Sequence, residues 1–494
     1  WYTASMSDYK PTIGLEIHVE LKTQTKMFCD SKNDPDVKEP NVNVCPVCMG
    51  HPGTLPTINK EAVKHVLRVG VAVGGEIADF TEFDRKNYFY PDIPKGYQIS
   101  QYAYPLVKGG SVNGVALTRI HLEEDTARNQ HVSSEASAKG DEGNHSLVDF
   151  NRAGVPLMEL VTEPVIHSAK EAGDFGREFQ LLLRALGVSD ADMEKGHLRM
   201  EVNLSVSKDD TLGTHTEVKN INSFSYAEKA VEYEIARQIA VLEAGEEVVQ
   251  ETRGWDSVKN QTYSQRKKES SHDYRYFPEP DLPKLKISEI PEFSHEALKA
   301  SLPELPWEKR ARYMAMGLKE EDARMFSSGG VFGSFFESVL AIVGDNADLV
   351  RLSTNYIAAD LAGLIEADAA ITIDPTDFAD LMKMINENLI SSRGAKDILK
   401  IMVESGGAPT DIAEKEGLLQ QSDEGALTAI VDQIISDNPK VVADYKAGKE
   451  NLLQFFVGQG MKASKGSANP ALLQELFRKG LTKYTTGKIK RKIN

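Results

Sequence analysis

Two glutamates and a histidine alternate near the start of the chain, in the segment Ile13-Gly-Leu-Glu-Ile-His-Val-Glu-Leu21. If this segment is a β-strand, Glu16, His18 and Glu20 share one face, because successive side chains of a strand point to opposite faces. Carboxylate oxygens with one imidazole suit a hard divalent ion such as Mg²⁺ or Mn²⁺. The alternative is a half-buried strand with a charged outer face, and the pattern alone does not separate the two.

A second alternating segment, predicted as a strand over 116–124, ends in three consecutive acids. These are Glu123, Glu124 and Asp125. Because strand faces alternate, such a run places at least one acid on each face. The sequence does not say which of the three faces Glu16 and His18, since a twisted strand end can turn either way.

Two more predicted strands, 198–206 and 214–220, carry acids and bases on one face. Arg199 and Glu201 share a face of the first, and Glu217 lies beside Lys219 in the second. Four strands with one apolar and one charged face predict a single sheet whose polar side is a site, because clustering such charges without a function costs free energy.

Clustered carboxylates with Arg and Lys nearby are the groups that phosphoryl transfer requires, since Mg²⁺ and cationic side chains neutralise phosphate oxygens. The sequence contains no Walker A motif, no Gly-x-Gly-x-x-Gly and no His-Glu-x-x-His. The residues therefore indicate a Mg²⁺-dependent enzyme whose ATP site is a carboxylate platform, and they name no substrate.

The sequence pattern of the strands and helices that must position these residues predicts an α+β domain followed by helical domains. The predicted helices are 60–73, 169–186 and 227–242, and residues 132–147 read as an exposed hairpin loop. After about residue 291, helical periods dominate, with breaks at Gly329-Gly330 and Gly406-Gly407. We expect domains at 6–290, 291–410 and 411–494, with residues 1–5 preceding a natural start at Met6.

Composition narrows the class of protein. The 494 residues include three cysteines and carry a net charge of −17. An odd, small number of cysteines argues against a disulfide framework and for a cytoplasmic protein. No apolar run reaches the length of a membrane span.

The net charge argues against broad wrapping of nucleic acid, although basic residues gather after position 460, as is common where a protein contacts RNA. A solubilising tail is the alternative.

Four motifs together are similar to a known family. They are the opening strand, Phe83-Asp-Arg-Lys-Asn-Tyr-Phe-Tyr-Pro-Asp-Ile-Pro-Lys-Gly-Tyr-Gln98, Asp149-Phe-Asn-Arg-Ala-Gly-Val-Pro-Leu-Met-Glu159 and Asp273-Tyr-Arg-Tyr-Phe-Pro-Glu-Pro-Asp281. The chain resembles the B subunits of the tRNA-dependent aspartyl/glutamyl amidotransferases (GatCAB) from residue 12 to about 482, including the tail motif at 457–470.

The resemblance implies an activity, a fold and partners. The family phosphorylates the side-chain carboxylate of misacylated Glu-tRNA(Gln) or Asp-tRNA(Asn) with ATP and Mg²⁺, and ammonia then displaces the phosphate. Such an enzyme is a carbon–nitrogen ligase with glutamine as amido donor. The implied fold is a glutamine-synthetase-like cradle with a mostly antiparallel sheet, then a helical domain and a helical tail that binds tRNA. Ammonia comes from an amidase, the A subunit, and a small C subunit completes the heterotrimeric complex.

The resemblance also assigns residues. It implies Glu16, His18 and Glu124 as catalytic and metal-binding groups, with Glu201 as a further ligand. The family more often has Asp at position 201 than the Glu found here. We expect the nucleotide phosphates to contact Arg85, Lys86, Arg199 and Lys219, and tRNA to contact Lys462, Lys465, Arg478 and Lys479.

Cysteines are the main departure from the family pattern. Cys45-Pro-Val-Cys48 is typical of a zinc knuckle, with Cys29 as a third ligand. Zinc-binding members usually have another Cys where this chain has Ser31, so His51 is the candidate fourth ligand. Free buried thiols are the alternative to zinc.

Two other functions remain as alternatives at this point. The related archaeal Glu-tRNA(Gln)-specific enzyme carries a large inserted domain, for which this chain has no room. A non-catalytic tRNA-binding scaffold would have lost its acids, whereas Glu16, His18 and Glu124 are present. The sequence does not distinguish Glu-tRNA(Gln) from Asp-tRNA(Asn) as substrate.

Overall fold

The computed structural model describes residues 8–132, 145–267, 271–366, 369–420, 424–464 and 468–489. The chain divides into two compact units, one ending at Pro306 and the other beginning at Trp307. A mixed α and β region with a large sheet precedes a helical region, as the sequence predicts. The first unit continues past the predicted boundary at 290 because α4 (His295–Ala300) packs on α1 (Lys60–Ala72).

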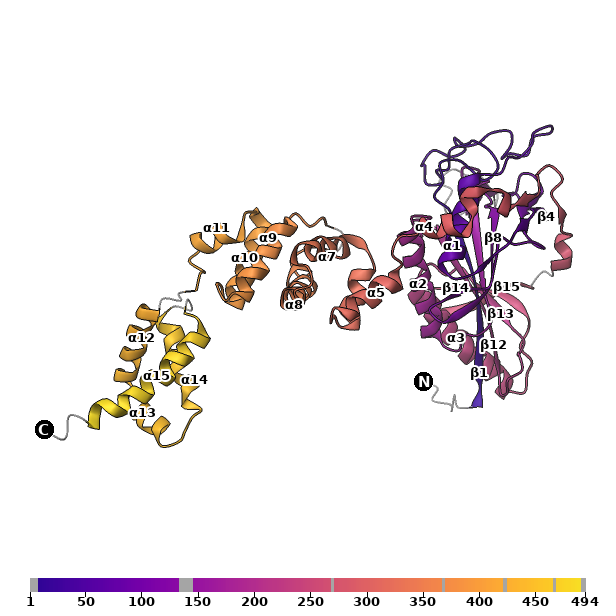
Figure 1. Ribbon diagram of the computed structural model, residues 1–494. Coiled ribbons are helices and arrows are strands. Elements are labelled where there is room, and N and C mark those ends of the chain that lie inside the picture. Colours follow the sequence, from indigo (N-terminus) through magenta and orange to yellow (C-terminus); the bar gives the residue numbers. More distant parts are fainter. Residues whose placement is uncertain are drawn as a thin grey trace, which may run out of the picture. The chain divides into compact units, whose positions relative to one another are not determined.

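The described residues of the first unit form a ten-stranded sheet (Figure 1). Its strand order is β15-β14-β13-β12-β1-β11-β8-β6-β2, with β7 paired to β8. All neighbouring strands are antiparallel except β13 and β14, which are parallel. The strands are β1 (Lys10–Glu20), β2 (Glu76–Ile77), β6 (Val107–Lys108), β7 (Ser111–Val112), β8 (Val115–Glu124), β11 (Pro156–Thr162), β12 (Leu198–Ser207), β13 (Thr216–Lys219), β14 (Glu251–Asp256) and β15 (Gln261–Lys267).

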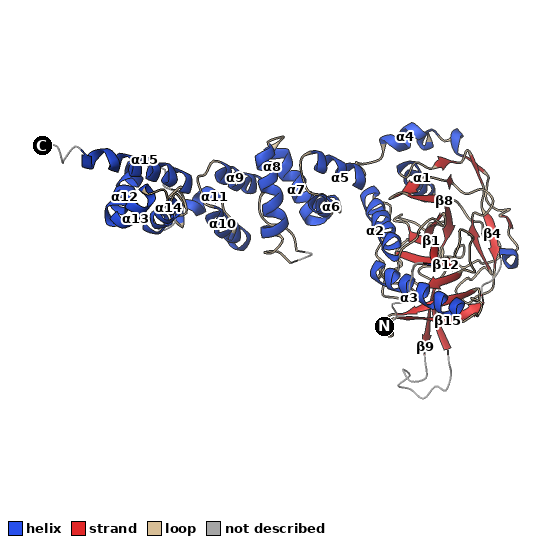
Figure 2. Ribbon diagram, turned by 90° about the horizontal axis from the view of Figure 1, so that it is seen from below, coloured by secondary structure: helices blue, strands red, loops and turns tan. Residues whose placement is uncertain are grey.

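Helices cover one face of this sheet. The helices α1, α2 (Ala169–Leu186) and α3 (Phe224–Glu243) lie along the same side of the strands (Figures 1 and 2). Ile13, Leu15, Ile17 and Val19 of β1 face them, and none of these side chains is more than 1% exposed. Burial of this apolar face is the main favourable term for the unit, and alternation turns the charged residues of β1 to the other face.

A smaller sheet lies on the side away from the helices (Figures 1 and 2). It consists of β4 (Asp84–Asn87), β5 (Tyr97–Ser100) and β16 (Phe277–Pro278). Two strand pairs complete the unit, β3 (Phe80–Thr81) with β17 (Leu285–Lys286) and β9 (Arg128–Val132) with β10 (His145–Asp149). The loop predicted at 132–147 falls between β9 and β10, and its residues 133–144 lie outside the described part of the chain.

The described residues of the second unit form two separate apolar cores. One extends from Tyr313 to Ala413 and the other from Leu427 to Leu481. Helices end and restart at both predicted glycine breaks. The helices are α5 (Pro306–Ala315), α6 (Glu320–Ser327), α7 (Gly330–Val343), α8 (Ala347–Asn355), α9 (Pro375–Asn386), α10 (Ser392–Ser405), α11 (Pro409–Lys415), α12 (Glu424–Asp437), α13 (Pro439–Lys446), α14 (Leu452–Ala463) and α15 (Pro470–Ile489).

Within the described residues, no single helix is long and apolar enough to cross a membrane. The pair α6 and α7 reaches that length and composition only together, with a bend of 105° between the two helices.

Candidate active site

The charged face of the large sheet is assembled by strand register. His18 of β1 lies opposite Glu159 of β11 and opposite Arg199 of β12. On the next strand, His121 of β8 lies opposite Glu159. Because paired residues share a face, these side chains meet on the side away from α1, α2 and α3.

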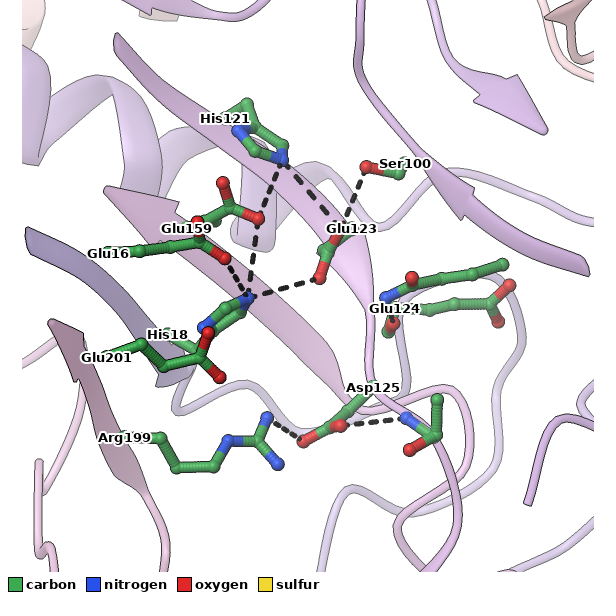
Figure 3. A network of polar contacts seen from close by, with 12 residues as sticks. Glu16, His18, Ser100, His121, Glu123, Glu124, Asp125, Glu159, Arg199 and Glu201 are labelled. Atoms are coloured by element: carbon green, nitrogen blue, oxygen red, sulfur yellow. Dashed lines mark hydrogen bonds and ion pairs between the residues drawn. The ribbon is translucent and has the colours of Figure 1, made fainter. Parts of the chain in front are cut away.

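His18 is surrounded by three carboxylates (Figure 3). Its Nε2 lies 3.3 Å from Oε2 of Glu159, 3.7 Å from Oε1 of Glu16 and 3.9 Å from Oε1 of Glu123. Burial alone would lower the pKa of His18, but the hydrogen bond and charge of Glu159 outweigh burial and raise this pKa from 6.5 to about 9. Without metal, the imidazole is therefore protonated on both nitrogens and positively charged at neutral pH.

Glu159 joins the two histidines of the site. Its Oε2 also lies 3.5 Å from Nε2 of His121, which is 3.8 Å from Oε2 of Glu123. Burial would raise the pKa of Glu159, but His121 and then His18 lower it below its usual range. Burial and the Glu159 charge raise the pKa of Glu16 to about 7. The cluster thus holds an ionised acid at its centre and a more weakly acidic one at its edge.

The donor atoms of this face fit a hard divalent ion. Three groups each have their ligand atoms within 4.8 Å of one another, and they share members. They are Glu16, His18 and Glu159; His121, Glu123 and Glu159; and Glu16, Glu201 and Glu217. Oxygen-rich sets with an imidazole are typical of Mg²⁺ or Mn²⁺ sites. The ion would replace the proton that His18 carries in its absence.

A cavity of about 290 Å³ opens above these acids. The large sheet supplies Glu16, Arg119, His121, Glu123, Glu159, Glu217, Lys219 and Thr252. Lys86 and Ser100 come from the small sheet, and Ser100 Oγ donates to Oε2 of Glu123 at 2.8 Å. Burial would lower the pKa of Lys86, but Glu123 and the other groups around it raise this pKa. The cavity therefore combines fixed anions with fixed cations.

The structure brings together several residues that the sequence predicts. Glu16, His18 and Glu201 share the charged face, and Lys219 Nζ donates to Oε2 of Glu201 at 2.6 Å. Lys86 lines the cavity.

Like Lys219, two further predicted phosphate contacts are paired with acids. Arg199 donates to Oδ2 of the buried Asp125 at 2.7 Å (Figure 3). Arg85 is the neighbour of Lys86 on β4 and binds Glu279 through two hydrogen bonds of 2.7 and 2.8 Å. It is absent from the cavity lining.

Glu124 lies apart from His18. It pairs with Pro156, one register step beyond the pair of Glu123 with Leu157, and therefore points away from the charged face. Its Oε2 accepts from Lys95 Nζ at 2.5 Å, and its Oε1 accepts from the Ile99 amide at 2.9 Å. It lines a different cavity, of about 100 Å³. Of the three consecutive acids 123–125, the one that lies beside His18 in this structure is Glu123.

Three residues of the cluster escape the sequence analysis: His121, Glu123 as the facing acid, and Glu159. Glu159 ends the 149–159 motif, which reads as a turn with polar groups. The signal of β11 that this reading overlooks is the mostly apolar run Pro156–Thr162, in which Glu159 is the one charged residue.

The three cysteines also come together. The sulfur atoms of Cys29, Cys45 and Cys48 lie within 4.8 Å of one another, whereas the exposed His51 is outside this group. Three thiols fit the soft donor set of zinc and leave one tetrahedral position to another ligand. Fully buried Lys26 places its Nζ 3.9 Å from Cys48 Sγ. The Cys29 hydrogen bond and the Lys26 charge lower the pKa of Cys48.

The predicted tRNA contacts lie in the second unit. Lys462 is exposed in α14, and Arg478 and Lys479 are exposed in α15. Lys479 Nζ forms an ion pair with Glu475 at 2.6 Å. Lys465 lies outside the described residues.

Comparisons with known proteins show the family of this chain. Residues 11–291 match the GatB/GatE catalytic domain family, and residues 334–481 match the GatB domain family. The B subunit of an aspartyl/glutamyl-tRNA(Asn/Gln) amidotransferase from Synechocystis is 43% identical over 494 residues, which cover 97% of this chain and 98% of that protein. The protein of the same name from Thermotoga petrophila is 44% identical over 486 residues, covering 95% and 98% respectively. The chain therefore belongs to the family of aspartyl/glutamyl-tRNA(Asn/Gln) amidotransferase B subunits.

Proposed function

We propose that this chain activates the side-chain carboxylate of Glu-tRNA(Gln), Asp-tRNA(Asn) or both with ATP, and converts it to the amide with ammonia. Support comes from the family and from one observation, the cavity lined by Glu16, Glu123, Glu159, His121 and Lys86. His18 contacts all three of these acids. The proposed reaction makes the chain the kinase and transamidase component of a carbon–nitrogen ligase, built as a glutamine-synthetase-like cradle.

The reaction has two steps. A carboxylate oxygen of the substrate attacks the γ-phosphorus of ATP, and ADP leaves. Ammonia then attacks the carbonyl carbon of the acyl phosphate, phosphate leaves, and the nitrogen loses a proton. Mg²⁺ bound by Glu16, His18 and Glu159 would neutralise phosphate charge. Lys86 and Lys219 lie on the cavity wall, where their ammonium groups can bind phosphate oxygens.

Ammonia and substrate require partners. Within the proposal, the amidase partner (the A subunit) releases ammonia from glutamine, the small C subunit holds the pair together, and the 411–494 region binds the tRNA. The exposed Lys462 and Arg478 suit contacts with phosphates.

The test is ATP hydrolysis by the chain reconstituted with both partners, in Mg²⁺ and free ammonia. Hydrolysis stimulated by Glu-tRNA(Gln) or Asp-tRNA(Asn), with amide product, supports the proposal and identifies the substrate. Glu16→Gln should abolish the stimulation, whereas Glu232→Gln, on the exposed side of α3, should not. A complex that binds these tRNAs without stimulation would instead be a tRNA-binding scaffold.

The cysteine group leaves two alternatives, a zinc site or three free thiols. Metal analysis of the purified chain separates them. One zinc per chain that is lost in Cys45→Ser supports the site. Absence of zinc, with three thiols titrating on unfolding, excludes it.

A further inference from the structure

The wall of the active-site cavity opposite the acids is aromatic, and the proposed chemistry leaves it without a role. Tyr102, Tyr274 and Tyr276 line the cavity together with Lys86. Tyr102 directly follows Gln101, whose side chain also lines the cavity and accepts from the Leu122 amide at 3.0 Å. Tyr274 ends a short 3₁₀ helix, and Tyr276 precedes β16.

Two of these rings form a stacked pair. The ring centroids of Tyr102 and Tyr276 are 4.3 Å apart and their planes differ by 11°. Tyr274 meets Tyr276 at 6.0 Å with its plane tilted by 69°. Tyr102 is 55% exposed, so much of its ring remains accessible although one face is stacked. A broad aromatic surface thus remains open beside the cavity.

The backbone fixes this arrangement at a conformational cost. Arg275, between the two tyrosines, has a φ of +45°, a left-handed value that is unfavourable for a side chain of this size. Asn87 Nδ2 holds this turn by donating to the carbonyl oxygens of Tyr274 at 3.1 Å and Arg275 at 2.9 Å. The amide of Tyr102 donates to Oδ2 of Asp84 at 2.9 Å.

Contact with Lys86 accounts for the position of some of these aromatic rings but not for that of Tyr102. The ammonium group of Lys86 lies 4.9 Å from the ring centroid of Tyr274 and 5.9 Å from that of Tyr88, so these two rings stabilise its charge. Tyr102 has no such contact with Lys86 among the described cation–ring pairs. Its stack on Tyr276 and its exposure therefore call for another partner.

We propose that the Tyr102–Tyr276 stack is an adenosine subsite, in which a purine base lies on the exposed ring of Tyr102. Aromatic side chains that present a ring face beside phosphate-binding cations are how proteins bind unstacked bases. The inference rests on the proposed function, which brings two adenosines to this cavity. One is the nucleoside of ATP, and the other is the 3′-terminal adenosine of the tRNA that carries the amino acid.

Equilibrium binding to the reconstituted complex tests the subsite and identifies its source of adenosine. One arm measures the Kd for ATP with Mg²⁺ and no tRNA. The other measures the Kd for uncharged tRNA with and without its terminal adenosine. Tyr102→Ala should weaken either the binding of ATP or the binding of intact tRNA by roughly 5- to 150-fold, the range expected for one stacked base. Tyr276→Ala should weaken the same arm, and Tyr102→Phe should keep most of the affinity because it keeps the ring.

Tyr104→Ala is the matched control. This tyrosine is 45% exposed on the same segment, but its ring packs on Phe80 at 5.0 Å and does not line the cavity. Unchanged Kd values for ATP and both tRNAs in Tyr102→Ala, in protein with wild-type thermal unfolding, would overturn the subsite. Stimulated ATP hydrolysis by the wild-type complex in the same preparation would show that the proposed function stands independently of that result.

Discussion

Glu159 is the side chain on which the charged cluster depends, since its carboxylate contacts both histidines. Glu159→Gln keeps the shape but removes the charge that holds the proton on His18. Because the proposed function makes Glu159 a ligand of the ion, we expect Mg²⁺ affinity or activity to fall by at least the roughly 10- to 100-fold that is usual for groups that only orient metal ligands. Mg²⁺-dependent ATP hydrolysis measures the effect, with Glu232→Gln as control. Full activity at ordinary Mg²⁺ concentrations would contradict this role.

The raised pKa of His18 predicts how metal-free stability varies with pH. Because this pKa is 6.5 unperturbed and about 9 in the folded protein, folding favours the proton. The contribution is complete below pH 6.5 and is lost as the pH rises through about 9, with an upper limit of about 3 kcal/mol. The difference in unfolding free energy between wild type and His18→Gln should therefore shrink from pH 6.5 to 10 in chelator. A difference that is constant over that range would contradict the assignment.

Strand alternation is sufficient to find Glu16, His18, Glu201 and Lys219 from the sequence. The choice between Glu123 and Glu124 is different, because it depends on the pairing of β8 with β11. Alternation within one strand gives relative faces, whereas the neighbouring strand decides which face meets the site.

At the scale of elements, the predicted helices are close to those observed. The bounds of α2 agree with the predicted 169–186, and α3 begins three residues before the predicted 227. That earlier start follows from Ser223, whose Oγ accepts from the Tyr226 amide at 3.1 Å. Two-residue strands such as β2 and β16 are beyond sequence patterns, because long-range pairing alone defines them.

The helices that cover the apolar face of the large sheet stabilise the sheet that carries the site. Phe179 of α2 is completely buried on the apolar side of the unit. Phe179→Ala should reduce the free energy of unfolding by about 3 to 5 kcal/mol, the usual cost of removing a buried aromatic ring. Chemical denaturation followed by circular dichroism measures the loss, and Glu232→Ala on the exposed side of α3 should cost far less. A loss below about 1 kcal/mol would mean that the helix layer repacks to fill the space left by the missing ring.

For the whole molecule, the two separate cores of the second unit allow one core to be deleted while the other is kept. The core from Leu427 to Leu481 has its own apolar side chains, so deleting residues 421–494 leaves the core from Tyr313 to Ala413 intact. We expect the KM for aminoacyl-tRNA to rise and kcat at saturating tRNA to change little, because the charged cluster is in the first unit. Steady-state kinetics of the reconstituted complex measure both. An unchanged KM would show that the basic tail does not bind tRNA.

The back-to-back placement of Glu123 and Glu124 has a consequence for how this segment can evolve. From Arg119 onward, β8 is paired in continuous register with β11. If the pairing before it is kept, one inserted or deleted residue between Arg119 and His121 would turn His121 and Glu123 toward the helices and bring Glu124 to the charged face. A substitution in this stretch changes one side chain, whereas a change of its length alters the residues that line both cavities. Divergence among relatives should therefore alter the composition of this stretch while its residue count stays fixed.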